Sequence, residues 1–402
     1  MTDNASFPLF SESPSPFGGI YIHVPFCRAK CPYCDFYSIT DTRRISRYVD
    51  MLITEVRQYP PFPYLFDTVY FGGGTPSLLI PDQVFRILEA LHQRFCISSS
   101  AEITLEVNPG TTNLKHLFAY RKAGINRINI GLQSTHDPTL RFLGRIHTAE
   151  AGVSIVHSAQ ATGFENIGVD LIYGVPGQSQ TLWQAELERV IRLSPAHLSC
   201  YTLTIEPGTP LAKKVENSAC QPLDEALAGA LFSFTATWLA DQGYPQYEIS
   251  NFARCHPGDG DWRSRHNQKY WRFCPYLGFG PAAHSFEKNR RWWNHRNLDA
   301  WEKAVAAGRS PVAESETLTP EQQLMEWIYL GLRQTCGIDV NATQQKFGID
   351  FFACFGPVIT DLEERGMMVS SPEQVRLTPK GMRFLETAAG MLIRQIPDQP
   401  GG

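Results

Sequence analysis

The 402-residue sequence has no apolar run near the roughly 20 residues of a membrane helix, and no marked excess of either charge. Lys and Arg total 36 against 40 Asp and Glu, so the net charge of −4 disfavours a general nucleic-acid partner. The first 17 residues also lack the basic start and apolar stretch of a signal peptide. We therefore expect a cytoplasmic protein with a disordered lead over residues 1–17.

Cysteine is too sparse for a disulfide scaffold, but three of the ten cysteines are closely spaced. Cys27, Cys31 and Cys34 form a CxxxCxxC pattern directly after the apolar run 20–24, which indicates metal or redox chemistry. A second cysteine pair, usual in structural zinc sites, is missing, so zinc with His23 as fourth ligand is the weaker alternative. A cubane iron–sulfur cluster usually takes four cysteines, and three would leave one iron open to another ligand.

The chain between residues 18 and 205 alternates short β-rich runs with helical patterns. Such alternation predicts a parallel sheet with right-handed crossovers, either an incomplete (β/α)6 barrel or an open doubly wound sheet. Sites in such folds lie at the carboxyl ends of the strands. The predicted strands cover residues 19–24, 67–71, 101–107, 127–132, 166–173 and 197–203.

The rest of the chain divides into an extension and a smaller unit. Residues 206–310 read as an aromatic-rich barrel extension with a strand near 247–249, and five of the eight tryptophans fall between residues 262 and 301. Helical patterns followed by a hairpin near 368–377 predict a winged-helix-like domain over 311–390, and 391–402 reads as a flexible tail. The acidic stretch 361–364 disfavours a DNA-facing role for that domain. A lid or partner-docking unit is the favoured interpretation.

A glycine run, 72–74, ends the second predicted strand and is followed by Thr75 and Pro76. A turn that needs positive φ explains one such glycine. Three in succession would also let a ligand approach the bare backbone. The run lacks the GK[ST] ending of a phosphate loop, so nucleotide triphosphate binding is not supported.

The cysteine pattern after the first strand, with GGGTP after the second, resembles the radical S-adenosylmethionine (SAM) superfamily. In that superfamily three cysteines hold a [4Fe-4S] cluster, and SAM binds the open iron through its amino and carboxylate groups. Reduction of the cluster cleaves SAM to a 5′-deoxyadenosyl radical. The resemblance implies Cys27, Cys31 and Cys34 as metal ligands, and SAM contacts from Tyr21, Tyr33, Gly73, Gly74, Thr75, Glu106, Gln133, Arg145 and Asp170.

Asp170 also stands out without the resemblance, because it interrupts an apolar strand. An acid there is costly unless it is paired. Arg145 is the available partner.

Over residues 18–387 the chain resembles the coproporphyrinogen-oxidase-like branch of the superfamily. Dehydrogenases of this branch carry a fourth cysteine two residues after the third, where this chain has Phe36. The HNxxYW pattern at 266–271 instead resembles that of HemW-type haem chaperones. This resemblance implies that the chain binds haem, with His266 as the iron ligand. A hydrogen-bonded packing role is the alternative for His266. Weaker candidates are His284 and His295 for iron, and Arg263, Arg265 and Arg272 for propionates.

Two functions remain open from the sequence. The first is a haem chaperone that carries a [4Fe-4S] cluster and exchangeable SAM, with a haem-acceptor protein and an electron donor as partners. Nucleic acid is not expected, and peripheral membrane association would come through the acceptor. The second is a radical SAM enzyme that decarboxylates or methylates a porphyrin, and Phe36 weakens the decarboxylation reading.

Overall fold

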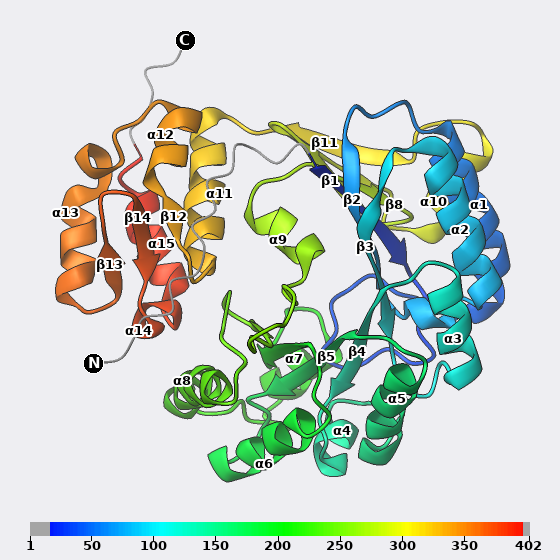
Figure 1. The fold of residues 1–402 in the computed structure, drawn as a ribbon, viewed down its shortest axis with the longest axis horizontal. Helices are drawn as coiled ribbons and strands as arrows, with labels where there is room; N and C mark the ends of the chain where they lie inside the picture. Colours follow the sequence, from blue (N-terminus) through cyan, green and yellow to red (C-terminus); the bar gives the residue numbers. More distant parts are fainter. Residues whose placement is uncertain (1–16, 397–402) are drawn as a thin grey trace.

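The computed structural model describes residues 17–396 (Figure 1). Within that range an eleven-stranded sheet has the order β11-β10-β9-β8-β1-β2-β3-β4-β5-β6-β7. Strands β1 to β6 are parallel neighbours in chain order, so the predicted α/β partial barrel is confirmed. These six strands are β1 (Phe17–Val24), β2 (Leu65–Gly73), β3 (Ile97–Val107), β4 (Arg127–Gln133), β5 (Asn166–Tyr173) and β6 (His197–Thr202).

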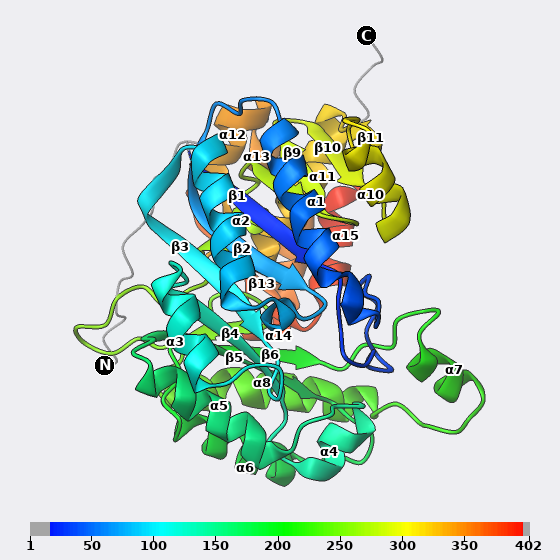
Figure 2. The same ribbon diagram turned by 90° about the vertical axis from the view of Figure 1, so that its right-hand side faces the viewer.

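Helices cover the outer face of this sheet, and in Figure 2 they face the viewer. The helix over Pro81–Arg94 buries an apolar stripe at helical spacing, formed by Val84, Ile87, Leu88 and Leu91. Pro81 at the first turn has no N–H to leave unpaired. The helices are α1 (Ile45–Gln58), α2 (Pro81–Arg94), α3 (Leu114–Lys122), α4 (Asp137–Phe142), α5 (Ala149–Ala161) and α6 (Gln180–Ile191).

Residues after β6 extend the sheet at both edges. Strand β7 (Asn251–Ala253) pairs antiparallel with β6, and β8 (Tyr276–Phe279) pairs parallel with β1. The strand predicted at 247–249 is wrong: that segment makes only isolated bridges before β7 begins. The other elements here are α7 (Pro210–Glu216), α8 (Glu225–Asp241), α9 (Arg265–Trp271), β9 (His284–Glu287), β10 (Arg290–Asn294), α10 (Leu298–Ala306) and β11 (Val312–Thr317).

The C-terminal elements pack around a separate hydrophobic cluster and form a winged-helix-like unit, as predicted. The capping box at Thr319 is also confirmed. A three-stranded sheet, ordered β12-β14-β13, completes the unit in the described part of the chain. Its elements are α11 (Pro320–Arg333), β12 (Ile338–Asp339), α12 (Val340–Phe347), α13 (Phe351–Glu364), β13 (Met368–Ser370), β14 (Gln374–Leu377), α14 (Pro379–Met382) and α15 (Leu385–Ile393).

Both predicted terminal segments need correction at their inner ends. Phe17 belongs to β1 and pairs with Leu65, so the lead does not include it. Residues 391–393 belong to α15, because Leu392 is fully buried in the C-terminal hydrophobic cluster. Residues 1–16 and 397–402 lie outside the described range. No helix of the described chain is long and apolar enough to cross a membrane.

A buried ion pair fastens α11 to the edge of the barrel. Arg333 Nε lies 2.8 Å from Glu248 Oε2, and the Glu248 side chain has no exposed surface. The other oxygen, Oε1, accepts hydrogen bonds from the backbone N–H of Ser250 and the amide of Asn251. Burial raises the pKa of Glu248, while the Arg333 charge opposes that rise. The orientation of the C-terminal unit therefore depends on a carboxylate that has little access to water.

We expect Arg333→Met to lower the free energy of unfolding by about 3 kcal/mol, because it leaves the Glu248 carboxylate buried without its partner. The matched control is Arg365→Met, whose exposed pair with Asp361 should contribute less than about 1 kcal/mol. Urea unfolding of the purified variants measures both. Equal losses for the two variants would contradict the assigned role of the pair.

Candidate functional site

The three clustered cysteines lie on the loop that follows β1, at the carboxyl end of the parallel strands. Cys27, Cys31 and Cys34 are free thiols and half-buried. The loop is closed on itself: the N–H of Cys27 donates to Ile39 O at 2.9 Å, and the N–H of Ile39 donates to Pro25 O at 2.7 Å. A short fixed loop therefore presents all three sulfurs from one edge of the sheet.

The glycine run after β2 packs directly against this loop. The N–H of Gly74 donates to Val24 O at 2.9 Å. A Cβ at Gly74 would lie 2.7 Å from Phe26 O and 3.0 Å from Phe26 N, so any larger residue would push the backbone away. Gly73 has φ +108°, and a Cβ there would lie 2.7 Å from the His23 ring. The run thus meets two demands at once, close backbone contact and left-handed conformation.

Polar side chains from two other loops reach the cysteine sulfurs. Thr75 Oγ1 donates to Cys27 Sγ at 3.6 Å, and Arg145 Nη1 donates to Cys31 Sγ at 3.5 Å. Asn108 connects the two donors: its amide donates to Thr75 Oγ1 at 2.9 Å, and its Oδ1 accepts from Arg145 Nη2 at 2.7 Å. The thiolate is the form that binds iron, and these contacts place hydrogen-bond donors beside two of the three sulfurs.

Arg145 does not form a direct ion pair with Asp170, although its charge acts to lower the pKa of that acid. The Arg145 guanidinium instead donates to Asn108 and to Gly131 O at 3.0 Å. Asp170 Oδ2 accepts a hydrogen bond from the Asn129 amide at 2.7 Å, and burial raises the pKa of Asp170. The physical reason is the loop after α4, which directs the guanidinium toward the cysteines.

A second carboxyl group, Glu106 on β3, lies within the barrel beside tyrosines. Its Oε1 accepts a hydrogen bond from Tyr70 OH at 2.8 Å. Burial raises the pKa of Glu106 to about 7, and burial also raises the pKa of Tyr21. A Cβ at Gly72 would lie 2.9 Å from the Tyr21 ring and 3.3 Å from Glu106 Oε1, which places those two side chains together.

The remaining residues predicted to contact SAM lie nearby. Burial raises the pKa of Tyr33, with the neighbouring Cys31 adding to that rise. Gln133 ends β4 with φ +67°, an uncommon conformation for a residue with a side chain. A Cβ at Gly131 would lie 3.1 Å from Gln133 Nε2 and 3.6 Å from Arg145 Nη2. The predicted residues thus gather at the carboxyl ends of β1 to β5.

The donor set fits a cluster and an amino-acid-like ligand. Arg145 Nε and Asp170 Oδ1 are buried and have no hydrogen-bond partner among the described residues. Buried polar atoms nearly always have partners, so these two are available to a zwitterionic ligand. A cubane gives each cysteine its own iron, so the sulfurs need not converge on one ion.

Zinc fits less well. The described residues contain no group of three or more His, Cys, Asp or Glu side chains that could hold a single metal ion. His23, the possible fourth ligand, has both ring nitrogens occupied, by Tyr21 OH at 3.1 Å and by Tyr37 O at 2.9 Å.

His266, predicted from the sequence to bind haem iron, lies on α9 and is only 1% exposed. Its Nδ1 is 2.8 Å from Thr68 Oγ1, and its Nε2 is 2.9 Å from Tyr270 OH. Its ring stacks on Tyr70 at 5.1 Å, and burial lowers its pKa to about 3, which keeps it neutral. Iron coordination would require one of the two hydrogen bonds to break, and the assignment stays a prediction.

The three arginines among the other haem-contact candidates have side-chain partners. Arg263 pairs with Asp261 at 2.7 Å, and Arg265 pairs with Asp67 at 3.0 Å. Arg272 Nη2 donates to the Gln268 amide oxygen at 3.0 Å. His284 stacks on Trp293 with ring centroids 5.5 Å apart, while His295 joins Pro311 and Ala282 through its backbone.

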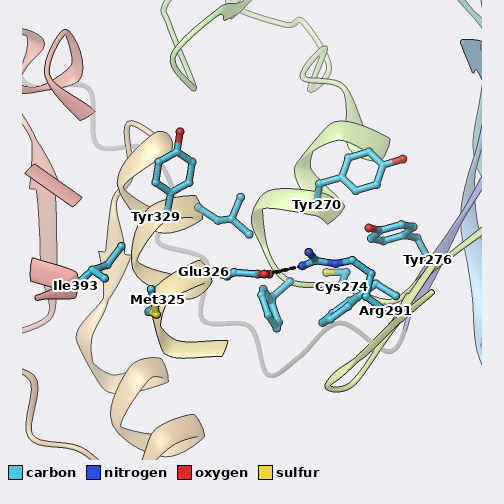
Figure 3. Close-up of a pocket in the computed structure, with 11 residues that line it drawn as sticks. Tyr270, Cys274, Tyr276, Arg291, Met325, Glu326, Tyr329 and Ile393 are labelled. Atoms are coloured by element: carbon cyan, nitrogen blue, oxygen red, sulfur yellow. Dashed lines mark hydrogen bonds and ion pairs between the residues drawn. The ribbon is translucent and has the colours of Figure 1, made fainter. Parts of the chain in front are cut away.

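Sequence reasoning missed a cavity of about 450 Å³ between α9, strands β8 to β10 and α11 (Figure 3). It lies next to the HNxxYW segment, since Tyr270 of that segment forms part of its wall. The concentration of aromatic residues over 262–301 was the available signal. The partner wall comes from residues 325–330 and 393, which no local pattern connects to that segment.

Comparison with known proteins agrees with this geometry. Residues 21–189 match the family model of the Radical SAM superfamily, and residues 318–384 match that of the HemN C-terminal domain. The solved structure of coproporphyrinogen III oxidase (HemN) from Escherichia coli superposes with a TM-score of 0.81 at 23% identity, covering 94% of this chain and 91% of that one. The fold and the cysteine loop therefore define a radical SAM protein.

The curated relatives narrow this class. Heme chaperone HemW of Lactococcus lactis is 30% identical over 90% of this chain and 94% of its own length, and that of Synechocystis is 33% identical over 84% of each. Mouse radical S-adenosyl methionine domain-containing protein 1, mitochondrial, is 31% identical over 98% of this chain and 92% of its own. The chain belongs to the HemW-type family of radical SAM proteins.

We predict that Gly74→Ala prevents assembly of the cysteine loop, because the new Cβ would collide with backbone atoms of Phe26. Iron and sulfide content after anaerobic reconstitution should fall at least fivefold. Gly260→Ala is the control, since a Cβ there meets nothing within 4 Å and the backbone is not left-handed. Full cluster content in Gly74→Ala would show that the close contact is dispensable.

Proposed function

We propose that this chain is a haem chaperone, which binds haem and passes it to an acceptor protein while carrying a [4Fe-4S] cluster and exchangeable SAM. The observation that carries the proposal is the cysteine loop itself. The loop presents three thiols, and hydrogen-bond donors contact the sulfurs of Cys27 and Cys31. Phe36, at the position of the fourth cysteine of the dehydrogenases, is 68% exposed and offers no ligand atom. The names of the HemW relatives support haem as the cargo.

Cys27, Cys31 and Cys34 would hold the cluster, and Arg145 would offset charge at Cys31. When bound and reduced, such a cluster supplies the electron that cleaves SAM. Around it, the backbone of Gly73 and Gly74 and the Thr75 side chain are proposed to meet the amino group of SAM. The buried atoms without partners, Arg145 Nε and Asp170 Oδ1, are available to its charged end.

Glu106 is proposed to accept hydrogen bonds from the SAM hydroxyls. Tyr70 OH fixes the orientation of this carboxyl group. Burial raises the pKa of Glu106 to about 7, so the ionised form is accessible near neutral pH. Three more side chains would complete the enclosure: Tyr21 beside Glu106, Tyr33 within the cysteine loop, and Gln133 beside Arg145.

The other parts of the proposal concern partners and organisation. We propose a cytoplasmic protein with an electron donor for the cluster, no nucleic-acid partner, and membrane association only through the haem acceptor. The proposed units are a barrel over 18–205, an extension over 206–310 and a docking or lid domain over 311–390. The exposed acidic residues Glu363 and Glu364 on α13 agree with a role other than DNA binding.

The second candidate function is a radical SAM enzyme that decarboxylates or methylates a porphyrin. The gathering of the SAM-contact candidates at the carboxyl ends of β1 to β5 favours it, because that arrangement is built for cofactor chemistry. Phe36 stands two residues after Cys34, where dehydrogenases of the branch carry a fourth cysteine, and this counts against decarboxylation.

We expect anaerobically purified protein to contain about four iron and four sulfide ions per chain and to bind haem saturably, seen as a Soret shift, with and without SAM. Cys31→Ser should lose iron, whereas Cys96→Ser, an exposed cysteine outside the loop, should retain it. Absence of saturable haem binding would overturn the chaperone proposal. Formation of protoporphyrinogen from coproporphyrinogen, with turnover, would establish the enzyme instead.

A further inference from the structure

The cavity beside the HNxxYW segment has the size and lining of a small-molecule site. Its volume of about 450 Å³ lies within the range of ligand pockets, and its lining is mostly apolar. One wall consists of side chains from α9 and strands β8 and β9, and the other comes from α11 and the end of α15 (Figure 3). The cavity therefore forms only when the C-terminal unit is docked.

The barrel-side wall is a continuous aromatic surface. Tyr270 and Tyr276 meet edge to face with centroids 4.7 Å apart, and Phe273 meets Phe286 at the same distance. Tyr276 also lies 6.1 Å from Phe286, which joins the two pairs. Opposite them are Tyr329 and the aliphatic Leu330 and Ile393. Such a slot suits a flat, apolar ring.

Charge in the lining is confined to one pair that joins the two walls. Arg291 on β10 donates to both carboxylate oxygens of Glu326 on α11, at 2.7 and 2.6 Å. Both side chains are under one-third exposed, and Glu316 adds a longer contact to Arg291 at 3.3 Å. A guanidinium is the preferred partner of a carboxylate, so a carboxylate on a ligand would compete with Glu326 for Arg291.

The lining also holds atoms that bind haem iron in other proteins. Cys274 brings a thiol and Met325 a thioether, and the tyrosines bring phenols. Tyr270 connects this wall to the HNxxYW pattern, because its hydroxyl contacts His266 Nε2. His266 would then act as a positioning residue behind the wall.

We infer that this cavity is the haem site, with the porphyrin ring against Tyr270, Tyr276 and Phe286 and a propionate on Arg291. The inference rests on the proposed chaperone function and identifies where in the chain haem binds. In this arrangement a ligand carboxylate displaces Glu326 from Arg291. Removing the Arg291 charge should therefore weaken haem binding, whereas removing the Glu326 charge should strengthen it.

The test is haem titration of full-length variants, read by the Soret band. Arg291→Gln is expected to weaken binding at least fivefold, and Glu326→Gln to strengthen it about threefold. Both break the same ion pair, so a merely structural role would weaken binding in both. The control is Arg290→Gln, the neighbouring residue on β10, which lies over Trp292 and points to the other face of the strand.

A second arm uses metal-free protoporphyrin IX, which has the same ring and carboxylates but no iron. It is expected to bind more weakly than haem and to show the same dependence on Arg291 and Glu326. Dependence for haem alone would contradict carboxylate recognition by Arg291. If wild-type protein binds haem and all variants bind equally, the cavity inference fails while the chaperone function stands; if wild-type protein does not bind, the function itself fails.

Discussion

The contact on which the candidate cofactor site depends is the close approach of Gly74 to the backbone at the end of β1. Its N–H donates to Val24 O, and the space that a Cβ would take is filled by Phe26. This contact fixes the loop after β2 against the loop that carries the cysteines. Thr75 follows directly and donates to Cys27 Sγ, so the hydrogen bond to sulfur is a consequence of the same packing. A residue with a side chain at position 74 would separate the two loops.

The candidate cofactor site and the cavity are joined through His266. On one side its ring stacks on Tyr70, whose hydroxyl donates to Glu106 within the barrel. On the other side its Nε2 contacts Tyr270, which forms part of the cavity wall. Burial keeps the imidazole neutral. The ring therefore connects two tyrosines, by stacking on Tyr70 and by a hydrogen bond with Tyr270. The HNxxYW pattern is thus explained by packing between two sites, in addition to any direct contact with a ligand.

The sequence was sufficient for the regular part of the fold, because hydrophobic periodicity and glycine–proline punctuation define β1 to β6 and their helices. Strand β5, predicted and observed at 166–173, is an example. The sequence was insufficient where tertiary structure decides which hydrogen-bond partner a side chain meets. Arg145 bonds Asn108 and Gly131 rather than Asp170, because the loop after α4 sets its direction. The cavity was beyond local reasoning, since Tyr270 and Ile393 are far apart in the chain and meet only through domain docking.

In the proposed protein, haem and the cluster occupy separate sites in one chain. The most direct test replaces Cys27, Cys31 and Cys34 together by serine and measures haem affinity by titration of the Soret band. The cavity shares none of its lining residues with the cysteine loop. We therefore predict an affinity within about twofold of wild type, in protein that contains no iron–sulfur cluster. Loss of saturable haem binding in this variant would place haem at the cluster site and contradict the separation of the two sites.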